Sequence, residues 1–156
     1  MARNELLVAT LSAIAVALTG CGPLADGSFT SLYDGYFQEC LRCHTADGEN
    51  RTSDTEKTLD FASRASAYTS ITTGSASGLV GIQEGCNGAS FVGSSVTTSL
   101  IVAVLDEDVR ETFDDPGHAD CDQTSISDMT LKVGSPPDAA FLADLKAWIE
   151  AGTPDD

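Results

Sequence analysis

The chain has 156 residues and a formal net charge of −16, because 24 Asp and Glu outnumber 8 Lys and Arg. This length supports a single domain. The basic residues are scattered singly along the sequence, which argues against nucleic acid as a partner, since a phosphate footprint needs clustered Lys and Arg. An acidic surface instead favours docking to a partner protein with a basic face. A surface adapted only for solubility is the alternative.

The N-terminus has the pattern of an export signal. Arg3 lies in a short polar start, and residues 6–18 form an unbroken run of apolar and small side chains. This run is too short to span a bilayer, but it fits the core of a signal peptide. The run ends in Leu-Thr-Gly-Cys at Cys21, which resembles the lipobox of bacterial lipoproteins.

The lipobox resemblance implies that residues 1–20 are a lipoprotein signal peptide and that Cys21 is the lipidated first residue of the mature protein. More than one acyl chain makes such a membrane anchor stable. Residue 22 is Gly rather than Asp, so nothing argues for retention in the inner membrane. We expect an exported lipoprotein of the cell envelope, in the outer membrane and facing the periplasm. An ordinary secretory peptide cleaved nearby is the alternative.

A tether over residues 21–28 leads into the domain that we expect over residues 29–153. A first helix is predicted from about residue 30, because aromatic residues and Cys40 recur at helical spacing. It leads into the run Cys-Leu-Arg-Cys-His at residues 40–44. Cys-x-x-Cys-His is the attachment signature of c-type haem.

The chemistry of this run explains its residue types. Cys40 and Cys43 lie one helical turn apart, so each thiol can close a thioether to a haem vinyl group, and His44 reaches the iron from the proximal side. A structural zinc half-site and a thioredoxin-like cysteine pair are the alternatives. Zinc needs a second pair of ligands, and thioredoxin chemistry needs a βαβ context; we find neither in the sequence.

The middle of the chain predicts helices between polar loops. Residues 45–58 indicate a surface loop, and a helix is predicted over about 60–72. Residues 74–93 are rich in Gly and Ser, which favours a loop with a short strand. Residues 95–109 have the length of a helix, although β-branched residues weaken it, and residues 112–129 are expected to form a loop. The buried stripe of the 95–109 helix would comprise Leu100, Ile101, Val104 and Leu105.

The last helix is the best defined. Ser135 can cap it, two prolines fit its first turn, Asp138 complements the helix dipole, and Gly152 followed by Pro154 ends it. Its apolar face is expected to consist of Phe141, Leu142, Leu145, Trp148 and Ile149.

The five cysteines can all be assigned. Cys21 is assigned to lipidation and the two cysteines of the haem motif to haem attachment. This leaves Cys86 and Cys121 as one pair in an oxidising compartment. A disulfide between them would stabilise the fold by roughly 4 kcal/mol on the chain-entropy model. Two free thiols are the alternative.

A second ligand to the iron would be a thioether or another imidazole. Besides the initiating Met and His44, the chain offers one of each, Met129 and His118. Met129 lies in a polar loop just before the last helix. His118 lies among acidic residues and is typical of a surface turn. We expect Met129 to be the ligand, with His118 as the alternative.

These features together resemble the mono-haem cytochrome c family. The resemblance rests on the haem motif at the end of a first helix and on a Met in a loop before a last helix of pattern LxxWIxxG. It implies an all-α fold: a small cytochrome c-like helical domain wrapped around one covalent haem c, with long polar loops and with Met129 as a ligand. It also implies that Tyr36 crosses the last helix and touches Leu145 and Trp148.

Two features depart from this family. Leu32 stands where its small members usually have Gly, and no Pro follows His44 closely to hold the His ring. The middle of the chain is longer than in small cytochromes c. Residues 59–61 and 67–68 resemble haem-binding domains of exported bacterial lipoproteins more weakly.

These expectations describe an electron carrier rather than an enzyme. Two retained axial ligands suit one-electron transfer, because little reorganises when the charge of the iron changes, and Met raises the potential relative to a second His. The expected partners are redox proteins and, through the lipid, the membrane. One alternative is a haem-based enzyme or gas sensor with an open distal site. The other is a non-catalytic binding module of the envelope.

Overall fold

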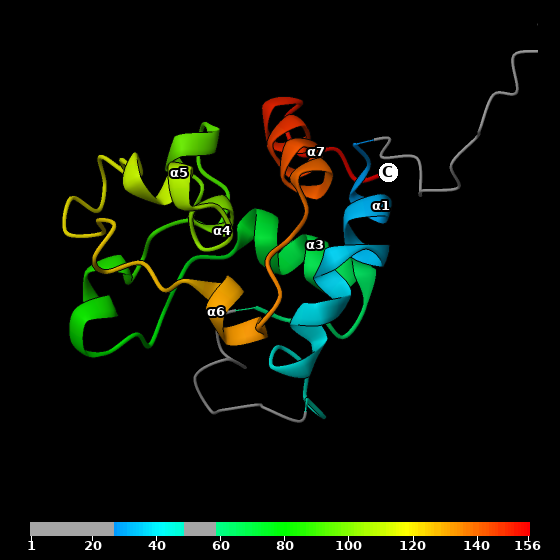
Figure 1. Cartoon of the computed structure of the whole chain (residues 1–156), viewed down its shortest axis with the longest axis horizontal. Coiled ribbons are helices and arrows are strands. Elements are labelled where there is room, and N and C mark those ends of the chain that lie inside the picture. Colours follow the sequence, from blue (N-terminus) through cyan, green and yellow to red (C-terminus); the bar gives the residue numbers. More distant parts are fainter. Residues whose placement is uncertain (1–26, 49–58) are drawn as a thin grey trace, which may run out of the picture.

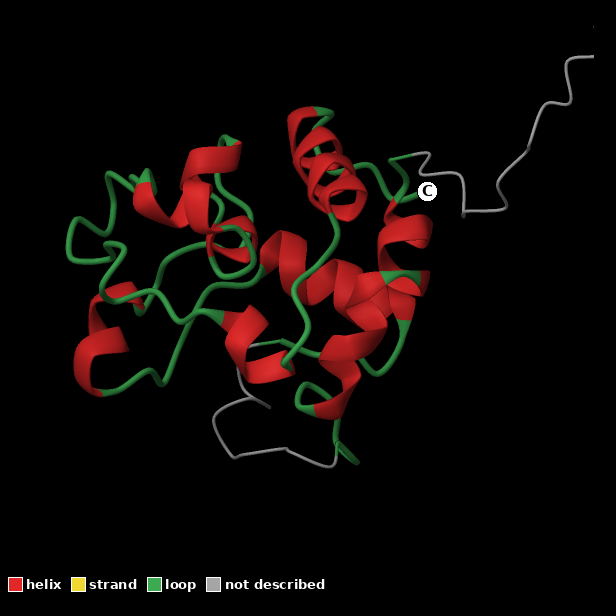
Figure 2. Cartoon of the chain, in the orientation of Figure 1, coloured by secondary structure: helices red, strands yellow, loops and turns green. Residues whose placement is uncertain are grey.

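The computed structural model describes residues 27–48 and 59–156, and in these ranges the chain is helical. The described part contains helices and loops (Figure 2), together with one isolated antiparallel bridge between Ser75 and Ser90. The all-α class predicted from the sequence is confirmed. The predicted signal peptide, the lipidation residue Cys21 and most of the tether lie outside the described residues.

Nine helical elements follow one another along the described residues (Figure 1). Six are α-helical and three are 3₁₀ turns. In chain order they are α1 (Phe29–Asp34), η1 (Tyr36–Arg42), α3 (Arg64–Thr73), η2 (Gly81–Cys86), η3 (Val96–Thr98), α4 (Leu100–Ala103), α5 (Glu107–Glu111), α6 (Met129–Val133) and α7 (Ala139–Glu150). Within the described residues, no helix has both the length and the apolar character needed to cross a membrane.

The first helix is broken, where the sequence predicted a continuous one. The chain leaves α-helical geometry at Gly35, whose ψ is −123°, after its N–H has bonded to the carbonyl of Ser31 at 3.0 Å. It resumes as the 3₁₀ turn η1, which contains Cys40 and has Cys43 as its C-cap. The break therefore sets the direction in which the haem motif leaves α1.

The last helix begins later than predicted. The carboxylate of Asp138 accepts a hydrogen bond from the backbone N–H of Phe141 at 2.7 Å, so Asp138, not Ser135, caps α7. Ser135 and the two prolines precede the helix. Both Ser and Asp can cap a helix, and the residue next to the first helical turn does so here. The predicted apolar face of α7 is confirmed: four of its residues are buried and Leu142 packs against them.

The predicted helix over residues 95–109 is divided into η3, α4 and α5. The hydroxyl of Ser99 donates to the carbonyl of Ser95 at 2.6 Å, which closes the first turn locally. Asp106 then caps α5 by accepting from the N–H of Val109 and also binds the ammonium group of Lys146 at 2.6 Å. These side-chain bonds to the backbone compete with a continuous helix.

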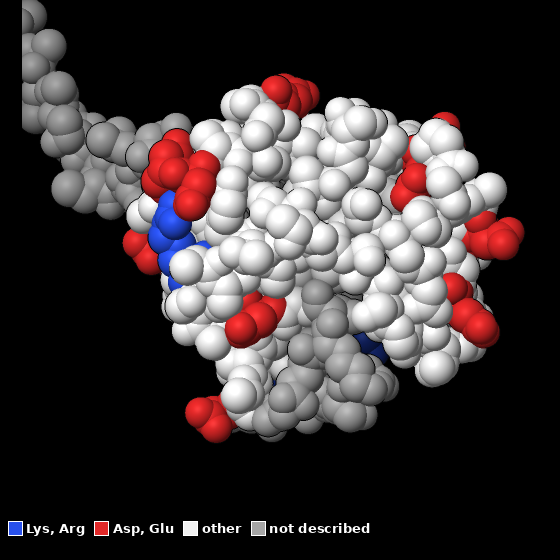
Figure 3. All heavy atoms as spheres, turned by 180° about the vertical axis from the view of Figure 1, so that it is seen from behind, with Lys and Arg blue, Asp and Glu red and all other residues white. Residues whose placement is uncertain are grey.

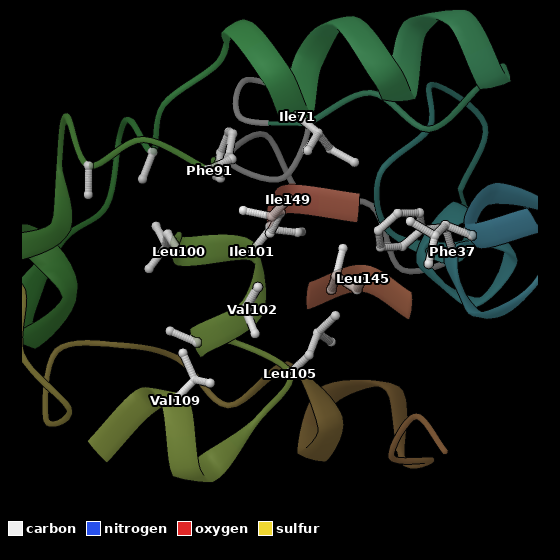
Figure 4. Packing of buried hydrophobic residues seen from close by; sticks show 14 of the residues in the cluster. Phe37, Ile71, Phe91, Leu100, Ile101, Val102, Leu105, Val109, Leu145 and Ile149 are labelled. Atoms are coloured by element: carbon white, nitrogen blue, oxygen red, sulfur yellow. The ribbon is translucent and has the colours of Figure 1, made fainter. Parts of the chain in front are cut away.

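The core lies where α3, α4 and α7 meet. Side chains of Ile71, Leu100, Ile101, Leu145 and Ile149 converge there (Figure 4). Helix α1 also packs against α7, where the ring of Phe29 contacts Trp148, the neighbour of Ile149, at 5.1 Å between centroids.

Tyr36 contacts α7 differently from the way the resemblance implies. Its ring lies 5.1 Å from that of Phe141, whereas Phe29, on the far side of the Gly35 break, takes the contact with Trp148. The Tyr36 hydroxyl donates to the carbonyl of Ser135 at 2.6 Å. Burial is the largest of the causes that raise the pKa of Tyr36 from 10.0 to about 12, and the nearby carboxylates of Glu39 and Asp128 add to it.

This raised pKa predicts an alkaline loss of stability. Because the folded pKa is above the unfolded one, the contribution of Tyr36 is present below about pH 10 and is lost as the pH rises toward 12. Tyr36→Phe should therefore lose less stability than the wild type over this interval. The measurement is denaturant unfolding at stepped pH, with Tyr33→Phe as a control that removes a different bonded hydroxyl. Parallel pH profiles for wild type and Tyr36→Phe would contradict it.

Candidate functional site

One cavity is lined by side chains from widely separated parts of the chain. Its empty volume is about 610 Å³, much of it open to solvent. Its wall is formed by four parts of the chain. These are the residues that flank the 49–58 segment (His44 and Leu59), the 76–91 loop, α4 with the following Val104, and the 125–129 segment. The apolar residues of this wall, apart from Met129, are Leu59, Ala76, Leu79, Phe91, Leu100, Ile101, Val104 and Ile126.

His44 and Met129 both line this cavity. They are the two residues that the sequence pattern and the family resemblance select as ligands of the iron. The other polar side chains at the wall are Gln83, Ser125 and Ser127. A mostly apolar pocket with an imidazole and a thioether suits a flat, apolar cofactor that binds two axial ligands.

His118 is not among the residues that line the cavity. Its Nδ1 lies 2.9 Å from the carboxylate of Asp115. Its ring also lies against Gly88, where an added Cβ would come within 2.6 Å of Nε2. His118 is therefore held in a turn by its acidic neighbour and the 76–91 loop.

The haem motif forms one turn. The backbone N–H groups of Cys43 and His44 both donate to the carbonyl of Cys40, at 3.2 and 2.9 Å. The two cysteines are partly buried, are not joined to each other, and do not themselves line the cavity. Only His44 of the motif reaches the cavity wall.

The Cys40 thiol differs from a redox-active one. Burial, followed by the charges of Cys43 and Glu39, raises its pKa from 9.0 to about 12. Reactive cysteine pairs instead depend on a lowered thiol pKa, so the thioredoxin-like alternative has no support from this site. Within residues 27–48 and 59–156, no group of three or more His, Cys, Asp and Glu is arranged to hold a metal ion. A haem iron does not require one, because the porphyrin supplies four ligands.

Phe61 contacts the His44 segment, a role that the sequence analysis did not assign. The N–H of Phe61 donates to the carbonyl of His44 at 2.8 Å, and the two rings meet edge to face with centroids 5.8 Å apart. Its neighbour Leu59 lines the cavity. The apolar pair at 59 and 61, between a polar segment and a helix, was the available signal.

Met129 is the first residue of α6, not part of a loop as predicted. Its backbone N–H donates to the carbonyl of Val104 at 2.9 Å. The preceding residue, Asp128, caps the helix. Partial burial raises the pKa of the Asp128 carboxyl, but the hydrogen bond from Thr130 and the charge of Arg110 outweigh it, so this pKa is below its ordinary value.

A disulfide and a hydrogen bond join the two segments that form the wall beside Met129. The sulfur atoms of Cys86 and Cys121 lie 2.09 Å apart, at the bonding distance that the predicted pair requires, and Cys86 lines the cavity. The side-chain amide of Gln83 donates to the hydroxyl of Ser127. The 76–91 loop, in which the sequence predicted a role only for the disulfide residue Cys86, thus forms much of this wall.

Acidic side chains occur at several separate places on the face seen in Figure 3, where Lys and Arg are few. This distribution agrees with the net charge of the whole chain, −16. No family model, curated protein or solved structure matches this chain, so its function must be argued from its own residues.

Proposed function

We propose that this protein is a membrane-tethered periplasmic electron carrier, a mono-haem c-type cytochrome with a cytochrome c-like fold. The observation that carries the proposal is the meeting of His44 and Met129 at one mostly apolar cavity. These two residues are 85 positions apart: His44 belongs to the haem motif, and Met129 is the second ligand that the family resemblance selects for such a haem.

Each part of the site has a task in this proposal. Cys40 and Cys43 would hold the haem covalently, and His44 and Met129 would bind the iron from its two sides. When bound, the haem would supply an Fe(II)/Fe(III) couple. The apolar wall excludes water and favours the less charged state, and a retained Met thioether leaves no open position for a substrate.

The cellular location and the redox partner of the carrier are inferred from its N-terminal lipid and from its surface charge. The lipidated Cys21 would tether the domain to the outer membrane on its periplasmic side, with residues 21–28 as the tether. The acidic surface would attract a redox partner with a basic docking face, at a rate that falls as the salt concentration rises.

A mass measurement tests the covalent cofactor and the anchor together. The protein purified from membranes should have the mass of the chain from Cys21 with its lipid and one haem, and the haem should survive acid-acetone extraction and denaturing electrophoresis. Cys43→Ala should leave at most one thioether and a poorly matured product. Arg42→Lys, which keeps both cysteines and the histidine, is the matched control. Haem that extracts freely from the wild type contradicts the proposal.

A further inference from the structure

Helix α6 carries Met129, which is partly buried against the core, but the rest of this helix has almost no apolar packing. It has five residues, none of them buried, and Leu131 at its centre is 79% exposed. A single helical turn of this length does not persist in water by itself. The position of Met129 must therefore depend on other contacts of α6.

Asp128 supplies such contacts with both oxygens of its carboxylate. Oδ1 accepts from the N–H of Thr130 at 2.9 Å and from its hydroxyl at 2.6 Å, which fixes the first turn of α6. Oδ2 accepts from Nη2 of Arg110 at 3.0 Å. One side chain thus orders α6 and ties it to α5.

Arg110 connects this carboxylate to the end of α4, a helix that also lines the cavity. Its second nitrogen, Nη1, donates to the carbonyl of Ala103 at 3.3 Å, at the end of α4 and one residue before Val104, whose carbonyl receives the N–H of Met129. The Arg110 side chain is only 12% exposed and that of Asp128 27%, so water and salt screen the pair weakly.

We propose that the Arg110–Asp128 pair positions the Met129 thioether in the cavity by fastening α6 to the corner between α4 and α5. The pair acts through the backbone of α6 and does not itself touch the cofactor. This inference rests on the proposed function, because it concerns the sixth ligand of the proposed haem.

Arg110→Gln tests the pair in the full-length holoprotein. Hydrogen bonds to charged groups are strong enough that losing one should raise the fraction of iron without Met129 about tenfold. Carbon monoxide should bind the reduced protein about tenfold faster. On heating, the near-infrared sulfur-to-iron band of the oxidised protein should disappear well before the far-ultraviolet helix signal.

Arg64→Gln is the matched control, because it removes another ion pair, with Asp155 at 2.7 Å, far along the chain from α6. In this variant the near-infrared band and the helix signal should disappear together, as in the wild type. Asp128→Asn keeps an oxygen that can cap α6 but loses the charge, so it decides the question if Arg110→Gln does not fold. The double variant should be no worse than the more damaging single variant.

The inference is overturned if both single variants bind carbon monoxide at the wild-type rate. It is also overturned if their band and helix signal are lost together. A wild-type protein without the near-infrared band is a different failure, since it removes the proposed His and Met ligation before any variant is made.

Discussion

Met129→Ala is expected to abolish the near-infrared sulfur-to-iron band of the oxidised protein and to let the reduced protein bind carbon monoxide. The variant removes the thioether that lines the cavity and leaves no sulfur within the wall except the disulfide-bonded Cys86. The midpoint potential should fall by a substantial fraction of the roughly 0.8 V span that axial ligands cover. Absorption spectroscopy, redox titration and carbon monoxide mixing measure the three effects.

His118→Ala is the control for this variant, because it removes the other candidate ligand, which is bonded to Asp115 away from the cavity wall. It should leave the spectrum and the potential almost unchanged. If His118→Ala loses the sixth ligand instead, the protein is a carrier of lower potential. If the wild type itself binds carbon monoxide rapidly, the distal side is open and a gas sensor or haem enzyme replaces the carrier.

Removing the disulfide should have the largest effect on stability. Cys86→Ala/Cys121→Ala releases a closure between residues 35 apart, which is expected to lower the free energy of unfolding by about 4 kcal/mol and the melting temperature by roughly 10–20 °C. Because Cys86 forms part of the cavity wall, the loss should also broaden the haem spectrum. Denaturant unfolding of the holoprotein measures the stability.

A reductant provides the control for this experiment. It should destabilise the wild type toward the double variant and have no further effect on the double variant. Alkylation of Cys86 or Cys121 in the exported wild type without prior reduction would contradict the disulfide, and so would wild-type stability in the double variant.

The helices with a regular apolar stripe could be predicted from the sequence. The predicted apolar face of α7 is correct because the spacing of its apolar residues repeats over three helical turns. The predicted start of α7 is wrong because Ser135 and Asp138 are both residue types that cap helices well. The two prolines between them precede the helix instead of forming its first turn. The split at Ser99 and Asp106 depends on side-chain bonds, one of them to Lys146 in α7, that local propensity cannot reveal.

Of the predicted haem residues, His44 and Met129 line the cavity, whereas most of the wall residues were not predicted from the sequence. Cys40, Cys43, His44 and Met129 stand out by residue type and order. The 76–91 loop has no periodicity, so its contribution to the cavity follows only from distant contacts such as Gln83 with Ser127. Arg110 was a scattered basic residue in the sequence, and its importance appears only when α5 and α6 are placed together.

The buried state of Cys40 bears on the order of events during maturation. A thiol whose pKa is about 12 is almost entirely protonated near neutral pH, so its sulfur reacts slowly once η1 has packed. This would protect Cys40 from exchange with the Cys86–Cys121 disulfide, but it would equally slow thioether formation. On the proposed function, haem would therefore have to be joined before η1 packs, and an apoprotein that folds first would mature poorly.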